Sequence, residues 1–135
     1  MILVDSSVWI DFFRNVTNAQ TNQLLTLMRR NQAGVDVGVA DLVLFEVMRG
    51  FATTAERARA QELMLALEVV EIGGLDNALL AAEHYRVLRS LGYTVRSPID
   101  VLLASYCITH DHMLLHRDAD FDVMHTLRGL RSWLT

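Results

Sequence analysis

Apolar and polar residues alternate along this chain with two different periods. Short apolar runs that end in polar residues are typical of strands buried on both faces of a parallel sheet. The clearest run opens the chain, where Ile2, Leu3 and Val4 lead directly into Asp5. We predict strands over Ile2 to Asp5, Val35 to Val39, Val69 to Ile72 and Met113 to His116, and a short terminal strand over Leu130 to Leu134 brings the number from four to five.

Between these runs, apolar residues recur at the spacing of amphipathic helices. We predict helices over Ser7 to Arg14, around Leu24, Leu27 and Met28 as far as Asn31, over Leu42 to Met48, from Thr53 to Leu67, over Asp76 to Leu91, from Ser97 to His110, and over Ala119 to Leu127. The expected N-caps are Ser6 or Ser7, Asp41, Thr53, Ser97 and Asp118. In the long helix the inward positions are Leu80, His84, Val87, Leu88 and Leu91.

The order of these elements indicates the fold class. Strands that alternate with helices predict a three-layer α/β/α sandwich around a mostly parallel central sheet of four to five strands. With 135 residues the chain is long enough for one hydrophobic core, so we expect a single domain over residues 1–135. No linker, repeat or low-complexity segment divides it.

Composition narrows the environment and the partners. No apolar run approaches the ~20 residues that a membrane helix needs, and Cys107 is the only cysteine, which suits a reducing cytoplasm. The formal net charge of −4 argues against a generic basic nucleic-acid binder. All 12 basic residues are arginine, however, and arginine binds phosphates through a bidentate fork. A phosphate-bearing partner therefore remains open.

Four acids occupy comparable places in the predicted fold. Asp5 ends the first strand, Glu46 is the charged residue of the apolar helix after the second, Asp100 lies in the first turn of its helix, and Asp118 follows the fourth strand. Carboxylates gathered at one sheet edge raise one another's pKa, and a hard divalent cation such as Mg²⁺ or Mn²⁺ relieves that repulsion. Such a cation suits hydrolysis of a phosphodiester.

The same residues carry a resemblance to a known family. The ordered motifs MILVDSSVWID, DLVLFEVMRG, SPIDVLLASYC and LLHRDADFD resemble those of a PIN domain, and more closely those of the VapC toxins of bacterial toxin–antitoxin pairs. The resemblance covers the whole chain. Its four acidic positions fall on Asp5, Glu46, Asp100 and Asp118, its small hydroxyl residue falls on Ser7, and its last Asp-Phe pair falls on Asp120 and Phe121.

The resemblance implies a Mg²⁺- or Mn²⁺-dependent endoribonuclease that cuts structured cellular RNA, with tRNA or rRNA as the expected substrate. Asp5, Asp100 and Asp118 would hold the metal, with Ser7 and Asp120 in support. It also implies a cognate antitoxin and a dimeric toxin or a toxin–antitoxin hetero-oligomer. Because an acidic cleft attracts arginine, an antitoxin segment that carries arginine would displace the metal.

Other interpretations of the same residues stay open at this point. Asp100 would also complete a capping box with Ser97, Asp118 would also serve as an N-cap, and Glu46 would also pair with Arg49 on the helix surface. His110, His112 and His116 are close enough in sequence to suggest zinc, although their spacing matches no zinc motif.

Two further classes of function compete with the nuclease. A phosphoacceptor signalling module is also an α/β fold with an acidic pocket, but it requires a lysine, and the chain has none. A non-catalytic binding module would use the fold only to hold a partner. For RNA contacts we expect Arg14, Arg96 and Arg117, which lie nearest the predicted cleft, whereas the other arginines are predicted on solvated helix faces.

Overall fold

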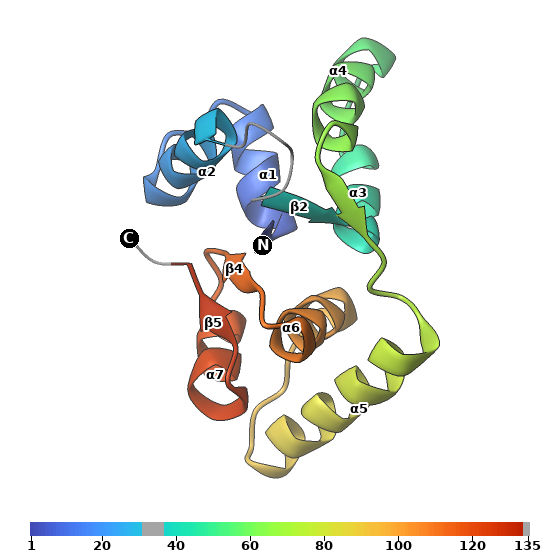
Figure 1. Cartoon of the computed structure of the whole chain (residues 1–135), viewed down its shortest axis with the longest axis vertical. Helices are drawn as coiled ribbons and strands as arrows, with labels where there is room; N and C mark the ends of the chain where they lie inside the picture. The colour runs from blue at the N-terminus through green and yellow to red at the C-terminus, as the bar shows by residue number, and fades with distance from the viewer. Residues whose placement is uncertain (31–36, 134–135) are drawn as a thin grey trace.

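The structure is a computed structural model that describes residues 1–30 and 37–133 (Figure 1). Its strands are β1 (Ile2–Val4), β2 (Val37–Ala40), β3 (Glu68–Val70), β4 (Met113–Leu115) and β5 (Arg131–Ser132). Its helices are α1 (Ser6–Phe13), α2 (Ala19–Arg30), α3 (Asp41–Met48), α4 (Thr54–Leu65), α5 (Leu75–Ser90), α6 (Pro98–His110) and α7 (Ala119–Arg128). No helix in the described ranges is long and apolar enough to cross a membrane.

The strands form one five-stranded sheet in the order β3-β2-β1-β4-β5, and every neighbouring pair is parallel. In the central strand β1, Leu3 lies opposite Gly38 of β2 and Leu114 of β4. All of β1 is buried, as its uninterrupted apolar run predicted. Gly38 packs closely in β2, because a Cβ there would overlap Met1 Sδ and press on Leu3, so that the Met1 side chain would have to move.

The helices cover the sheet in two groups. In Figure 1, α1 to α4 gather in the upper half of the view and α5 to α7 in the lower half. Within each group the helices pack on one another, α1 against α2 and α3 in the first and α6 against α5 and α7 in the second. The core between the layers contains Trp9, Leu103, Leu114 and Phe121, all fully buried. The predicted three-layer α/β/α sandwich with a parallel sheet is confirmed.

Several predicted boundaries differ from the structure. β3 begins earlier than expected, at Glu68, because its pairing with β2 starts there, and β4 ends before His116. α2 begins earlier too, since Asn18 and Thr21 exchange hydrogen bonds of 2.9 and 2.8 Å that start the helix inside a segment predicted to be polar coil. Residues 35 and 36 of the predicted second strand and residue 134 of the terminal strand lie outside the described residues.

Two expectations about helices were wrong. Asp41 is the first residue of α3 and not its N-cap; its Oδ1 accepts hydrogen bonds from the backbone N–H groups of Leu42 and Ile72 at 2.9 Å, which ties α3 to the segment after β3. In α5, Leu80 and Leu91 are exposed instead of inward-facing. The buried positions of that helix are Ala81 and Leu88, because α5 packs on α6 along a narrow seam.

Candidate active site

Asp5 is buried at the point where β1 turns into α1. Its carboxylate Oδ2 accepts hydrogen bonds from the backbone N–H of Ser7 at 3.3 Å and from the Ser7 hydroxyl at 2.6 Å. Asp5 is therefore the N-cap of α1, and the predicted cap at Ser6 or Ser7 was wrong. The other oxygen, Oδ1, is buried with no hydrogen-bond partner. Burial raises the pKa of Asp5, the bonds from Ser7 and Ser6 oppose this, and the charge of Asp118 adds to the rise.

Glu46 reaches the same region from α3, the helix that follows β2. Its Oε1 is buried without a hydrogen-bond partner. Burial raises the pKa of Glu46, and the charge of Asp5 raises it further. A hydrogen bond with the Ser6 side chain and, more weakly, the charge of Arg49 act in the opposite direction. The predicted surface pairing with Arg49 is thus a minor influence on a carboxylate that faces the other acids.

Asp100 lies in the first turn of α6 and is 8% exposed. Ser97 makes no side-chain capping hydrogen bond, so the capping-box interpretation of Asp100 was wrong. Burial raises the pKa of Asp100 to about 7, together with the negative charges of Asp5, Asp118, Glu46 and Asp120, in decreasing order. Asp100 thus interacts with every other acid of the group, which places it electrostatically at the centre.

Asp118 follows β4 and caps α7, as predicted, by accepting a hydrogen bond of 2.9 Å from the backbone N–H of Asp120 at its Oδ1. Its own backbone N–H donates to Nδ1 of His116 at 3.3 Å. Nδ1 is then an acceptor, so a neutral His116 carries its proton on Nε2, which lies 2.8 Å from Ser132 Oγ. Burial lowers the pKa of His116 and favours that neutral form.

Three of the acids come close enough to share one ion. Asp100, Asp118 and Asp120 each offer a carboxylate oxygen, and these atoms lie within 4.8 Å of one another. Asp120, predicted as a supporting residue, belongs to this compact group, whereas Asp5 adjoins it through the charges that raise the pKa values of both Asp5 and Asp100. Unpartnered buried oxygens on Asp5 and Glu46 and an all-oxygen donor set fit a hard divalent cation.

The histidines do not form the alternative zinc site. The rings of His110 and His112 pack at a tilt against Tyr106 at the amino end of β4, at ring-centroid distances of 4.2 and 5.8 Å. His116 follows the carboxyl end of that strand. In the described part of the chain, no group of metal-ligating side chains with metal-binding spacing includes a histidine.

The three arginines predicted to contact RNA have different surroundings. The backbone N–H of Arg96 donates to Asp120 Oδ2 at 3.4 Å, which leaves its exposed side chain beside the acidic group. Arg117 forms a salt bridge of 3.2 Å with Asp11 of α1. Arg14 borders a cavity of about 280 Å³ that Phe13 and Phe51 also line.

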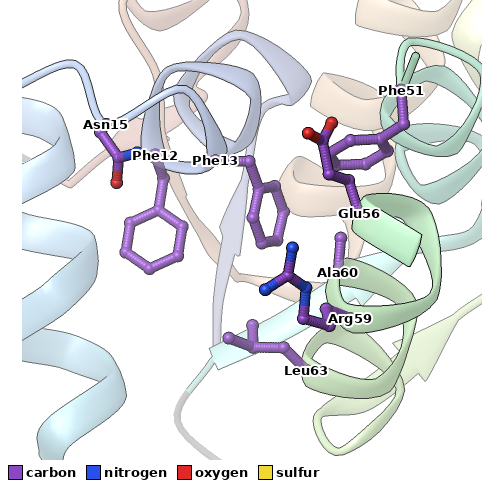
Figure 2. Close-up of a pocket in the computed structure, with 8 residues that line it drawn as sticks. All are labelled: Phe12, Phe13, Asn15, Phe51, Glu56, Arg59, Ala60 and Leu63. Atoms are coloured by element: carbon purple, nitrogen blue, oxygen red, sulfur yellow. The ribbon is translucent and has the colours of Figure 1, made fainter. Parts of the chain in front are cut away.

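A groove opens beside that cavity, between α1 and α4. Its volume is about 410 Å³. Figure 2 shows five of the residues that line it: Phe12, Phe13 and Phe51, with Glu56 and Arg59 from α4. The rings of Phe13 and Phe51 meet edge to face at 5.6 Å. We call this the aromatic groove.

Sequence reasoning named Ser6 and His116 in other roles and did not name Ser132; it predicted none of their observed contacts at this site. Ser6 directly follows the first acid, which in retrospect was a signal. His116 precedes Asp118 by two residues, but its bond to Ser132 joins the ends of two neighbouring strands and could not be inferred from spacing.

Comparison with known proteins places this geometry in context. VapC ribonuclease Mb1587 of Mycobacterium bovis is 29% identical over 132 residues, which cover 98% of this chain and 97% of the relative. Ribonuclease VapC11 of Mycobacterium tuberculosis matches with the same identity and coverage.

Solved structures share the fold at lower identity. VapBC2 from Rickettsia felis, bound to a promoter DNA fragment, superposes with a TM-score of 0.75 at 16% identity and covers 99% of this chain and 100% of that one. VapC20 of Mycobacterium tuberculosis, a sarcin-ricin loop cleaving toxin, gives a TM-score of 0.67 at 18% identity, with 91% of this chain and 94% of that one covered. The sequence model of the PIN domain matches residues 2–126. The chain therefore belongs to the PIN domain family.

Proposed function

We propose that this protein is a metal-dependent endoribonuclease and the toxin of a toxin–antitoxin pair. The observation that carries the proposal is the convergence of four acids from three other segments on Asp100, whose pKa its burial and their charges raise to about 7. No folding requirement explains five carboxylates in mutual repulsion, whereas a cation-dependent reaction does. Two relatives of nearly the same length that are named as VapC ribonucleases support this interpretation.

The acids have distinct roles in this proposal. Asp5, Asp100 and Asp118 would hold Mg²⁺ or Mn²⁺, with Glu46 and Asp120 close by. When bound, the cation supplies an activated water and neutralises charge on the phosphoryl oxygen. The Ser7 hydroxyl fixes the orientation of the Asp5 carboxylate through the 2.6 Å hydrogen bond, and His116 fixes the backbone that carries Asp118.

RNA cleavage by purified protein tests the assignment. Asp5→Asn and Asp100→Asn should each lose cleavage of total tRNA and rRNA in Mg²⁺ or Mn²⁺, while Asp111→Asn, at the amino end of β4, should cut at the parental rate. Equal cleavage by the parent and both acid-site variants would refute the catalytic assignment. Mapping the 5′ ends of RNAs cut in a host, with Asp5→Asn as control, would identify the substrate.

The buried thiol of Cys107 is compatible with our expectation of a reducing cytoplasm.

The partner follows from the same proposal. Structures with this fold include VapBC toxin–antitoxin complexes, and we place a cognate antitoxin against the aromatic groove, with an arginine of its tail in the acidic site. Phe13 and Phe51 offer apolar contact there, and Glu56 and Arg59 offer charges of both signs at the rim. A Phe51→Glu variant should lose co-purification with the antitoxin but keep RNA cleavage. Unchanged co-purification would remove the groove from the interface.

The phosphoacceptor alternative is not favoured by any observation in the site. The chain offers no lysine, and the first acid is followed by Ser6 and Ser7, which bind Glu46 and Asp5. Labelling of an aspartate by acetyl phosphate would be the result that revived it.

A further inference from the structure

A further cavity lies between α5 and the beginning of α6. It encloses about 450 Å³. Small and flat apolar groups form most of its surface, contributed by Ala78, Ala81, Ala82, Pro98 and Val101. Val95, Leu102 and the two larger side chains Tyr85 and Arg96 also line it. We call this cavity the α5–α6 pocket.

The lining of the α5–α6 pocket suits a planar, partly polar ligand. Tyr85 is 37% exposed, so one part of its ring is available for stacking. Unstacked nucleobases bind proteins by stacking on tyrosine rings and on the flat guanidinium of arginine. A floor of alanines lets a flat ring approach the helix backbone, which a bulkier side chain would prevent.

The α5–α6 pocket adjoins the first turn of α6, which carries Asp100. Pro98 and Val101, which line it, flank Asp100 in the first turn of α6. Arg96 belongs to both places, because its side chain lines the pocket and its backbone N–H binds Asp120. A helix with its side chains is about 10 Å across, so a nucleic-acid strand that passes the start of α6 spans the two sites within one or two nucleotides.

The surroundings of the α5–α6 pocket are positively charged, although the whole chain is negative. Residues 83–96 contain three arginines, at 86, 89 and 96, and one acid, Glu83. Arg128 of α7 joins them through a hydrogen bond of 2.9 Å to His84. Arginine side chains around an aromatic pocket complement a phosphate backbone.

The same charges disfavour a second copy of the chain as the occupant. In a symmetric dimer each patch meets its own counterpart. Arginines would then face arginines, and like charges across an interface cost several kcal/mol. The exposed leucines at 75, 79 and 80 lie in the amino-terminal half of α5, whereas Leu91 is exposed at its carboxyl end beside Arg89.

We propose that the α5–α6 pocket binds one unpaired nucleobase of the RNA strand whose phosphate lies at the acidic site. Tyr85 stacks on the base, and Arg96 contacts the base plane or its phosphate. The pocket would therefore favour substrates that present a splayed base next to the cut, such as a loop. This inference rests on the proposed ribonuclease function and adds to it the place where the substrate is read.

Binding without cleavage tests the pocket directly. In the Asp5→Asn background, a short single-stranded RNA of mixed sequence carrying 2-aminopurine is titrated, with anisotropy reporting affinity and 2-aminopurine quenching reporting stacking. Tyr85→Ala should weaken binding about tenfold and abolish the quenching, whereas Tyr85→Phe should preserve both. Arg96→Ala should weaken binding and lower the salt dependence by about one unit of slope.

Two further variants separate the pocket from general effects. Tyr93→Ala removes a tyrosine that is 46% exposed but does not line the pocket, and should bind RNA like the parent. Ala82→Leu narrows the pocket with a good helix former and should weaken binding as Tyr85→Ala does. In the active protein, Tyr85→Ala should raise KM about tenfold and leave kcat nearly unchanged.

Each outcome decides between the two proposals. Equal affinity and quenching for Tyr85→Ala and Tyr93→Ala would overturn the pocket, even if the parent cuts RNA. A Tyr85→Ala protein that changes from dimer to monomer with unchanged RNA affinity would also overturn it and assign the pocket to a contact between copies. A parent that cuts no RNA, but whose binding still depends on Tyr85, would refute the ribonuclease and leave the pocket standing.

Discussion

The acids at the two edges of the sheet differ in whether an arginine neutralises them. At the amino edge, Arg131 binds Asp111 through a salt bridge of 2.9 Å and a hydrogen bond of 2.8 Å to its backbone carbonyl. At the carboxyl edge, no salt bridge among the described residues joins an arginine to Asp5, Glu46, Asp100 or Asp118. The acid at the amino edge is thus neutralised by an arginine, whereas the acids at the carboxyl edge repel one another.

This contrast indicates what the carboxyl edge is for. Buried carboxylates without counter-charges reduce folding stability, because each disfavours ionisation of the others. A protein with 12 arginines has ample means to neutralise them, as it does at Asp111 and at Asp11. Under the proposed function a cation relieves this repulsion, so removing one of the acids should stabilise the fold and reduce RNA cleavage.

The largest expected effect is on Asp100→Asn. Its RNA cleavage should fall at least about a hundredfold, or about 2.7 kcal/mol in barrier, while its free energy of unfolding at pH 8 rises, because a repelled charge is removed. Cleavage rates and urea denaturation measure the two quantities. The amino-edge variant Asp111→Asn should instead keep its activity and lose up to about 1 kcal/mol of stability. If Asp100→Asn were fully active and less stable than the parent, Asp100 would behave like Asp111, and the proposed difference between the two edges would be wrong.

The second-largest expected effect is the stabilisation of the fold by a bound cation. At about a hundred times its Kd, Mn²⁺ or Mg²⁺ should add about 2.7 kcal/mol to the free energy of unfolding and raise Tm by several degrees. Asp111→Asn should retain this gain and Asp100→Asn should lose most of it. Thermal melts with and without the ion measure it. An identical shift in the two variants would mean that the ion binds elsewhere.

The pH dependence of stability without added metal should have an unusual sign. The folded-state pKa of Asp100 is about 7, above its ordinary 3.8, so the folded protein retains a proton that the unfolded chain releases. Stability should then fall as pH rises from about 4 to about 7, by about 2 kcal/mol after solvent screening is allowed for. Denaturant titrations across this range measure the slope. In Asp100→Asn the free energy of unfolding should depend less steeply on pH over this range. An unchanged dependence would mean that other groups cause the effect.

The smallest expected effect concerns His116. Replacing His116 by a residue that offers no acceptor to the backbone N–H of Asp118 should lower kcat about tenfold, with little change in KM. A loss of this size is typical of a group that orients a metal ligand. His116→Asn preserves an acceptor near the Nδ1 position and should keep more activity than His116→Gln. At the amino edge, His112→Ala should leave kcat unchanged. Equal kcat for the Asn and Gln variants would argue against a positioning role.

The convergence of the acids was predictable because it depends on strand order along the chain. Asp5 and Asp118 directly follow parallel strands, Glu46 lies in the helix after β2, and Asp100 lies in the first turn of α6. Parallel strands bring such positions to one edge regardless of loop length. The choice of cap was not predictable, since Asp5, Ser6 and Ser7 are all good N-caps and only the turn geometry selects among them. The place of Asp120 in the compact acid group likewise depends on the first turn of α7, which residue types alone do not specify.

Helical periodicity was a weaker guide on α5. It treats all apolar residues on one stripe as buried, whereas burial depends on the width of the packed partner. α5 contacts α6 along small residues, so Ala81 is buried and Leu80 beside it is exposed. The α5–α6 pocket, which exists because of those alanines, was therefore invisible at the level of pattern.

Asp5 also connects two parts of the molecule mechanically. It caps α1, and that helix of eight residues carries Phe12 and Phe13 of the aromatic groove at its other end. A helix this short behaves as a rigid rod about 12 Å long. A partner that binds the aromatic groove and displaces α1 would therefore also displace Asp5. Such a partner would change the acidic site without contacting it.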